Sequence, residues 1–239
     1  MSLIKEIDTP AIIVDLNIVK ENIHTYQRYC DDIGIKLRPH IKTHKIPALA
    51  KLQIGAGAVG ITAQKINSFL TDAKKLIEAK NIAVNTVSIG GSPDMWKVKD
   101  IPVATEYRIG TYIFNDRSLV EKEICLDDKV ALTVLATVVS TPTKNRAIID
   151  AGSKVLTSDL FGLNDHGSVI NFPELRVTQL TEEHGTIVSE QNTNLKIGQK
   201  IQIMPNHVCV VTNMLDEVNL ITETKELKKV KVIARGKVW

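Results

Sequence analysis

The change in hydrophobic periodicity along the chain constrains its fold most strongly. Up to about residue 116, short apolar runs alternate with segments whose apolar residues recur at helical spacing, as Leu16, Val19 and Ile23 do. Such alternation predicts β/α units on a parallel sheet or barrel. We expect strands at residues 11–14, 36–42, 58–62 and 86–89, and helices at residues 16–29, 47–54 and 71–78.

The second half of the chain has a different pattern. Its apolar runs are rich in Val, Ile and Thr, have no helical period and are separated by turn residues. We therefore expect two domains, an α/β domain at residues 1–120 and an all-β domain at residues 121–239. The expected strands of the second domain are residues 130–139, 146–149, 174–180, 200–204, 208–211, 218–222 and 230–234.

Composition excludes several functional classes. The net charge of the 239 residues is only +3 and the charges are spread along the chain, so we expect no nucleic-acid surface. No apolar run approaches the roughly 18 residues that span a bilayer, which predicts no membrane segment. The three cysteines are irregularly spaced and the first residues do not resemble a signal peptide, which favours a reducing, cytoplasmic location.

The basic stretch at residues 38–45 is the first candidate site. On a strand, the side chains of Arg38, His40 and Lys42 would share one face at its C-terminal end, where catalytic residues of β/α barrels lie. A lysine there, beside other cations and away from bulk water, has its pKa lowered toward the nucleophilic amine of Schiff-base chemistry. The alternative is a basic edge that binds any anion.

Two further patterns suggest ligands. Gly90, Gly91 and Ser92 follow a predicted strand and precede a proline, which indicates an anion pocket at a helix start, although ordinary strand-helix turns look similar. His207 and Cys209 are two residues apart, so on a strand both would point the same way and could bind one zinc ion. The alternative is a buried cysteine beside a hydrogen-bonded histidine.

Taken together, the chain resembles the fold-type III pyridoxal-phosphate family that includes D-serine dehydratase and D-threonine aldolase. The resemblance is specific because several motifs occur in the same order. They are Asp8-Thr9-Pro10, Arg38-Pro39-His40-Ile41-Lys42-Thr43-His44-Lys45, Gly55-Ala56-Gly57-Ala58-Val59-Gly60, Gly90-Gly91-Ser92-Pro93, Gly110-Thr111-Tyr112-Ile113-Phe114-Asn115-Asp116, Asp150-Ala151-Gly152-Ser153-Lys154, Glu182-Glu183-His184-Gly185 and Pro205-Asn206-His207-Val208-Cys209.

The resemblance implies a fold and a set of roles. It implies an alanine-racemase-like (β/α) barrel followed by an all-β domain, a homodimer, and a D-3-hydroxy amino acid as substrate. Lys42, rather than Lys45, matches the lysine that carries pyridoxal 5'-phosphate as a Schiff base. The other implied site residues are Arg38 and His40 for catalysis, Gly90, Gly91, Ser92 and Tyr112 for the cofactor, and His207 and Cys209 for Zn²⁺.

The implied reaction is elimination from the substrate. Lys42, once released, is the natural base for the Cα proton, and zinc would make the β-hydroxyl a better leaving group. In this family a His-x-Cys pair accompanies D-serine dehydration and a His-x-Asp pair is typical of the aldolases. The same groups serve either reaction, so D-threonine aldolase remains an alternative.

The predicted barrel is too short for the family. A complete (β/α)8 barrel takes about 250 residues, whereas residues 11–116 provide about 106, room for three or four units. The middle units are expected to be missing near residues 66–70. Either the chain lacks a block or the barrel is partial, and a different closed fold is a third alternative. Two other functions therefore stay open, a non-catalytic cofactor-binding protein with a degenerate barrel and a metal-binding or interaction β domain.

Overall fold

The computed structural model describes residues 3–62 and 86–236. Within them, a parallel sheet has the strand order β2(Lys36–Leu37)-β4(Glu106–Tyr107)-β3(Ser88–Ile89). Leu37 and Ile89 both lie opposite Tyr107, so the three strands end at the same level. The predicted helix at residues 71–78 and the expected gap at residues 66–70 lie outside the described residues.

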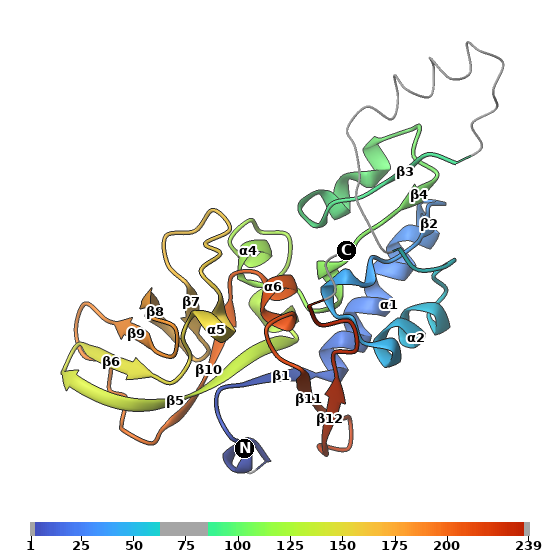
Figure 1. Cartoon of the computed structure of the whole chain (residues 1–239). Helices are drawn as coiled ribbons and strands as arrows, with labels where there is room; N and C mark the ends of the chain where they lie inside the picture. Colours follow the sequence, from blue (N-terminus) through green and yellow to red (C-terminus); the bar gives the residue numbers. More distant parts are fainter. Residues whose placement is uncertain (1–2, 63–85, 237–239) are drawn as a thin grey trace.

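Two helices accompany this parallel sheet. α1(Leu16–Asp32) begins where Asp15 accepts hydrogen bonds from the backbone N–H groups of Asn17 and Ile18, an N-cap that the sequence predicted. α2(Pro47–Gly55) starts with the predicted proline in its first turn. Figure 1 shows α1, α2 and the three short strands in one part of the molecule.

The other part is a sheet that closes on itself. In the described chain its order is β10-β7-β8-β9-β6-β5-β1-β11-β12, and β10 also pairs with β5. Six of these strands therefore form a closed antiparallel barrel without free edges. They are β5(Leu132–Thr143), β6(Arg146–Ile149), β7(Gly167–Val169), β8(Phe172–Leu180), β9(Gly185–Val188) and β10(Lys200–Pro205).

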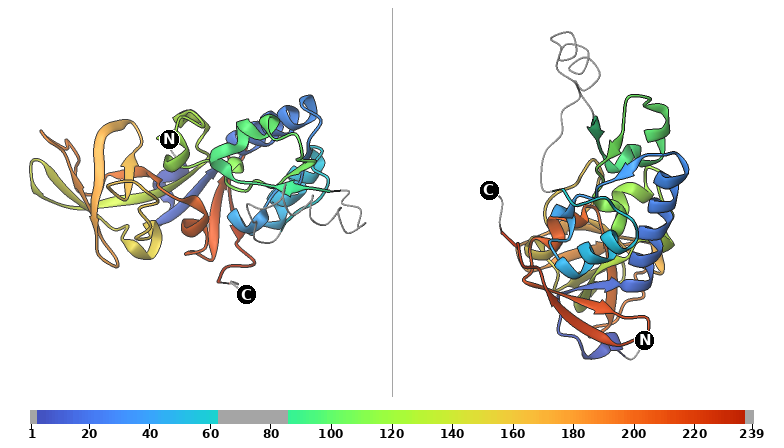
Figure 2. Two further views of the ribbon diagram at one scale, coloured as in Figure 1. Left: turned by 90° about the horizontal axis from the view of Figure 1, so that it is seen from above. Right: turned by 90° about the vertical axis from the view of Figure 1, so that its right-hand side faces the viewer.

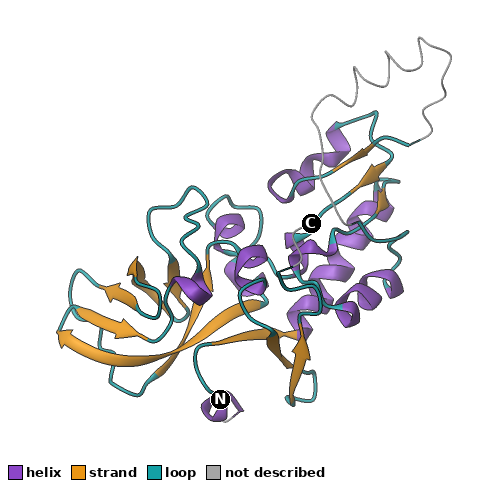
Figure 3. Ribbon diagram, in the orientation of Figure 1, coloured by secondary structure: helices purple, strands orange, loops and turns teal. Residues whose placement is uncertain are grey.

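The beginning and the end of the described chain meet beside this barrel. β1(Ala11–Asp15) is antiparallel to β5 and parallel to β11(Glu217–Ile221), which pairs with β12(Leu227–Lys231). Figures 2 and 3 show the barrel strands at one end of the molecule and the helices α1 and α2 at the other. Hydrogen bonding thus joins β1, from the first 120 residues, to the sheet of the second half.

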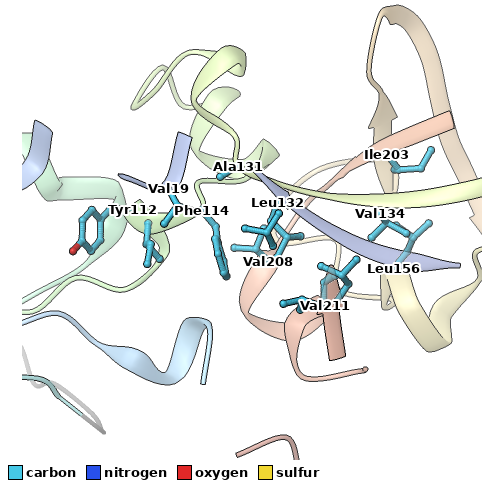
Figure 4. Packing of buried hydrophobic residues seen from close by; sticks show 14 of the residues in the cluster. Val19, Tyr112, Phe114, Ala131, Leu132, Val134, Leu156, Ile203, Val208 and Val211 are labelled. Carbon is cyan, nitrogen blue, oxygen red and sulfur yellow. The ribbon is translucent and has the colours of Figure 1, made fainter. Parts of the chain in front are cut away.

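A continuous apolar core connects the two parts. Val19 of α1, Phe114, Leu132 of β5 and Val208 belong to one cluster of buried side chains. Figure 4 shows these residues in one row that leads to Ile203 in the barrel. One apolar core therefore spans the junction between the two parts.

Most of the predicted elements are confirmed, with small shifts of their ends. The strands expected at residues 36–42 and 86–89 are much shorter, and that at 58–62 is only a single bridge between Thr62 and His40. The helix after Gly90-Gly91 is a 3-10 helix, η3(Ser92–Asp100), with Gly91 rather than Ser92 at its N-cap. In the described residues no helix is both long and apolar enough to cross a lipid bilayer.

One predicted strand is wrong. Residues 208–211 form the helix α6(Val208–Thr212) instead. Their β-branched side chains favour a strand. The backbone N–H of Val208, however, is bound by the buried carboxylate of Asp116 at 3.2 Å, so a tertiary contact fixes the helix start and overrides the local preference.

Candidate functional site

A cavity of about 380 Å³ lies where the three parallel strands end. The chain segments after β2, β4 and β3 line it together with the starts of α4(Arg117–Val120) and α6. The carboxyl ends of parallel strands are the usual place for ligands in α/β folds. The predicted site residues that line this cavity are His40, Lys42, Gly90, Gly91, Ser92, His207 and Cys209.

Larger cavities exist elsewhere. One of about 940 Å³ lies between residues 6–12 and the β11–β12 hairpin and contains none of the predicted site residues. We therefore take the smaller cavity as the candidate active site, because the predicted site residues line it and not the larger one.

The stretch that carries Lys42 is a turn rather than a strand. Backbone hydrogen bonds continue past β2, since the N–H groups of Arg38 and His40 donate to the carbonyl oxygens of Tyr107 and Ile109, and the chain then enters the short 3-10 helix η2(Ile41–Thr43). His40 is the N-cap of η2, and its Nδ1 accepts a hydrogen bond from the backbone N–H of Lys42 at 3.3 Å. The expectation that Arg38, His40 and Lys42 share one strand face is wrong, because Lys42 lies in η2 rather than on a strand. Lys42 still reaches the cavity, although its side chain is exposed rather than sheltered from water.

His40 is a buried and neutral member of the site. Burial lowers its pKa to about 4, and the cations Lys42 and Arg108 add to this effect. Because Nδ1 accepts a hydrogen bond, the ring proton lies on Nε2. Nε2 is buried and has no hydrogen-bond partner among the described residues. The ring thus offers one unused donor beside the cavity.

Arg38 and Tyr112 do not line the cavity. The Nε of Arg38 donates to Glu106 at 2.6 Å, which ties its side chain to β4. Tyr112 is fully buried, and its hydroxyl accepts a hydrogen bond from Nε2 of Gln53 at 2.9 Å. Burial raises the pKa of Tyr112, so the phenol stays protonated. The structure therefore does not bring these two residues together with Lys42.

The glycine loop approaches its neighbour closely. A Cβ added to Gly90 would lie only 1.8 Å from the carbonyl oxygen of Arg108, so only glycine fits there. The backbone N–H groups of Gly90, Gly91 and Ser92 donate to no described backbone group. The loop thus presents donors to the cavity, which suits a phosphate.

His207 and Cys209 meet at the start of α6. Burial alone would lower the pKa of His207, but its hydrogen bond with Cys209 and the carboxylate of Asp159 outweigh burial and raise that pKa to about 9. Nδ1 of His207 lies 2.9 Å from Oδ2 of Asp159. The Sγ of Cys209 donates to the hydroxyl of Thr43 at 3.2 Å, so Cys209 contacts the turn that carries Lys42.

This donor set fits a zinc ion with open positions. The described residues hold no group of three or more His, Cys, Asp and Glu side chains arranged for a metal. Imidazole nitrogen and thiolate sulfur are nevertheless zinc ligands. Zinc-binding histidines usually bond a carboxylate through their other nitrogen, as His207 does here with Asp159.

Several residues at this site were not predicted from the sequence, among them Arg108, Asp116 and Phe161 in the cavity wall and Asp159 beside His207. Arg108 lines the cavity beside Gly90, and Asp116 and Phe161 line it near α6. Asp116 could have been found, since an Asp before a short helical segment is an N-cap signal. Arg108, Asp159 and Phe161 carry no local signal, because only the fold brings Arg108 and Phe161 to the cavity and Asp159 to His207.

Comparison with known proteins gives a consistent group of relatives. The family described as "Putative serine dehydratase domain" matches residues 131–221. An uncharacterized protein of Mycobacterium tuberculosis is 34% identical over 131 residues, which are 52% of this chain and 98% of that protein. D-serine dehydratase of Dictyostelium discoideum is 31% identical over 65% of this chain and 44% of that enzyme. D-threonine aldolase of an Arthrobacter species is 39% identical over 27% of this chain and 17% of that enzyme.

Solved structures agree about the fold. A variant of D-threo-3-hydroxyaspartate dehydratase matches with a TM-score of 0.87 at 18% identity, over 96% of this chain and 96% of that chain. An alanine-racemase-like protein from Idiomarina loihiensis matches with a TM-score of 0.84 at 18% identity, over 97% and 98% of the two chains. The predicted likeness to alanine-racemase-like proteins is confirmed for the fold, whereas the shortened (β/α) barrel and the separate all-β domain stay predictions. By sequence, this chain matches less than half of the length of the Dictyostelium enzyme.

Proposed function

Because this chain belongs to the family of D-serine dehydratase and D-threonine aldolase, which are lyases, we propose that it is a pyridoxal-phosphate- and zinc-dependent lyase acting on D-3-hydroxy amino acids, with D-serine dehydration as its reaction. One observation carries this proposal. Lys42, the glycine loop at residues 90–92 and the pair His207 and Cys209 come from distant parts of the chain and line the same cavity.

The described residues fit the cofactor at two points. Lys42 would hold pyridoxal phosphate covalently, and the N–H groups of Gly90, Gly91 and Ser92 would bind its phosphate. Bound there, the cofactor supplies an electron sink for charge that develops at the substrate Cα. Once it no longer holds the cofactor, the amine of Lys42 would take the Cα proton. The unused Nε2–H of His40 would donate a hydrogen bond to a bound ligand.

His207 and Cys209 would hold the metal in the same cavity. A zinc ion supplies Lewis acidity that helps a hydroxyl leave. The hydroxyl of Thr43, which accepts from Cys209, would keep the sulfur at the cavity wall. The overall reaction releases ammonia from D-serine and leaves a 2-keto acid. Cys209, where the aldolase pattern has Asp, supports dehydration over aldol cleavage.

We also propose that residues 1–120 form a shortened barrel domain and residues 121–239 a β domain with the metal pair. The parallel strands in the described residues leave open edges, and Lys42 is exposed. A second copy of the chain would cover these edges, so we propose a homodimer. The same features favour a second candidate function, a protein that binds the cofactor without turnover.

One set of assays separates these functions. The dehydratase releases ammonia from D-serine, and a chelator abolishes the release. The aldolase instead forms glycine and an aldehyde from D-threonine. Binding without turnover gives the cofactor absorbance band and neither product. Lys42→Ala should lose the band, whereas Lys51→Ala, which removes an exposed lysine of α2, should keep it. A metal-loaded protein that shows no band would contradict the proposal.

A further inference from the structure

The segment between α5(Ser153–Leu156) and β7 contacts His207 from two directions. We call residues 157–163 the His207 loop. At the ring edge, Oδ2 of Asp159 lies 2.9 Å from Nδ1 of His207. On the ring face, Phe161 stacks on the imidazole with 4.1 Å between the ring centroids and 28° between the planes. The ring is thus held in both its orientation and its plane.

Asp159 uses both of its oxygens for this arrangement. Oδ1 accepts a hydrogen bond from the backbone N–H of Phe161 at 3.0 Å, while Oδ2 faces His207. An ionised carboxylate only accepts hydrogen bonds, so Nδ1 of His207 must carry a proton. With the Nδ1 proton held by Asp159, Nε2 is the nitrogen that can give up its proton to bind a metal ion.

The backbone of the His207 loop is strained where it reaches the ring. Phe161 has a φ of 49° and Thr157 a φ of 65°, in the left-handed region that side chains other than glycine rarely adopt. Burial of Phe161 does not explain its left-handed backbone, because the residue is 41% exposed. Its contacts are instead His207 on one side and the ammonium of Lys122, 5.2 Å from the ring centroid.

The residue next to His207 anchors the same loop. The Nδ2 of Asn206 donates to the carbonyl oxygen of Leu160 at 3.3 Å, and its Oδ1 accepts from Arg117. Asn206 and Arg117 are both buried. The loop is therefore hydrogen-bonded through Leu160 to the residue that precedes His207.

We propose that Asp159 is the positioning residue of His207, fixing the tautomer and direction in which the ring offers Nε2 to a metal ion, and that Phe161 fixes the ring plane. This inference rests on the proposed metal pair. It assigns to the His207 loop a role in metal affinity, in addition to any role in folding.

Cobalt(II) binding to the full chain tests this role without an activity assay. Cobalt(II) replaces zinc in His/Cys sites, and a thiolate-to-cobalt absorption band reports ligation by Cys209. We expect Asp159→Ala to weaken Co²⁺ and Zn²⁺ affinity by about 10–100-fold, as the loss of such carboxylate partners does elsewhere. Asp159→Asn keeps an acceptor for the backbone of Phe161 but turns an amide donor toward Nδ1 of His207. That donor favours the tautomer with its proton on Nε2, so Asp159→Asn should not recover the affinity. Glu174→Ala, an exposed acid on β8, is the matched charge control and should bind as the parent does.

Proton NMR of the cobalt form gives a second readout. The ring N–H of a metal-bound histidine appears as a shifted, exchangeable signal, and its hydrogen bond to Asp159 should slow its exchange. We expect this signal in the parent and its loss in Asp159→Ala. If Asp159→Ala binds cobalt with parental affinity and keeps the signal, the positioning role is overturned while the metal pair stands. If the parent itself shows no thiolate band, the metal pair fails and the inference fails with it.

Discussion

Asp116 connects the folding of this chain to its candidate site. Its side chain is fully buried at the N-cap of α4. Oδ1 accepts from the backbone N–H of Leu119 at 3.2 Å and from the hydroxyl of Ser118 at 2.6 Å. Oδ2 accepts from the backbone N–H of Val208 at 3.2 Å, which fixes the start of α6. One carboxylate therefore holds both helix starts at the cavity.

We expect Asp116→Ala to lower the free energy of unfolding by about 3 kcal/mol. Loss of an N-cap costs about 1 kcal/mol. Loss of a hydrogen bond to a charged acceptor, with the N–H of Val208 left buried, costs a further 1.5–3 kcal/mol or so. Burial raises the pKa of Asp116, which shows that the carboxylate is itself costly to bury and keeps the net loss from being larger.

Urea unfolding followed by circular dichroism measures this change. Ser118→Ala removes one of the three donors and leaves both helix starts capped, so its loss should be about 1 kcal/mol. Asp128→Ala, an exposed acid, should change stability by less than about 0.5 kcal/mol. A loss below about 1 kcal/mol for Asp116→Ala would refute the reasoning, because the two helix starts would then not depend on this carboxylate.

Three further predictions concern single residues. Burial lowers the pKa of His44 from 6.5 to about 4, so its contribution to stability is present above pH 6.5 and is lost as the pH falls toward 4. Between pH 6.5 and 4 the free energy of unfolding of His44→Gln should therefore fall by about 3 kcal/mol less than that of the parent chain. Gly90→Ala should weaken cofactor binding, measured by absorbance titration, at least about tenfold, whereas Gly91→Ala, whose added Cβ meets no atom within 4 Å, should have a smaller effect. Tyr112→Phe should lose about 1 kcal/mol of stability, with cofactor affinity unchanged in the same titration, since its hydroxyl bonds only Gln53 in the described chain.

The sequence predicted the arrangement of the fold where local patterns and tertiary contacts agree. The caps and periodicity of α1 and α2, and the β-branched runs of β5, β6 and β10, led to elements that the structure contains. The strand expected at residues 208–211 failed because its helical start depends on Asp116, which is 92 residues away in sequence. No local propensity reports such a contact.

The part of the candidate site that follows the parallel strands was predictable from the sequence. Lys42 and the glycine loop each follow a strand of the same parallel sheet, so the ends of the strands had to bring them together. Asp159 and Phe161 lie 48 and 46 residues before His207 and follow no motif. Their contact with His207 depends on how the β barrel closes, which the pattern of strands alone does not determine.

Covalent trapping of the cofactor would identify the lysine that holds it. The full chain, incubated with pyridoxal phosphate and reduced with borohydride, would retain the cofactor on whichever lysine holds it, and peptide mass mapping would identify that lysine. Our account predicts the label on Lys42 at one equivalent per chain, and no comparable label on Lys45. A label on Lys45, or one spread over exposed lysines such as Lys51, would contradict the assignment of this cavity as the cofactor site.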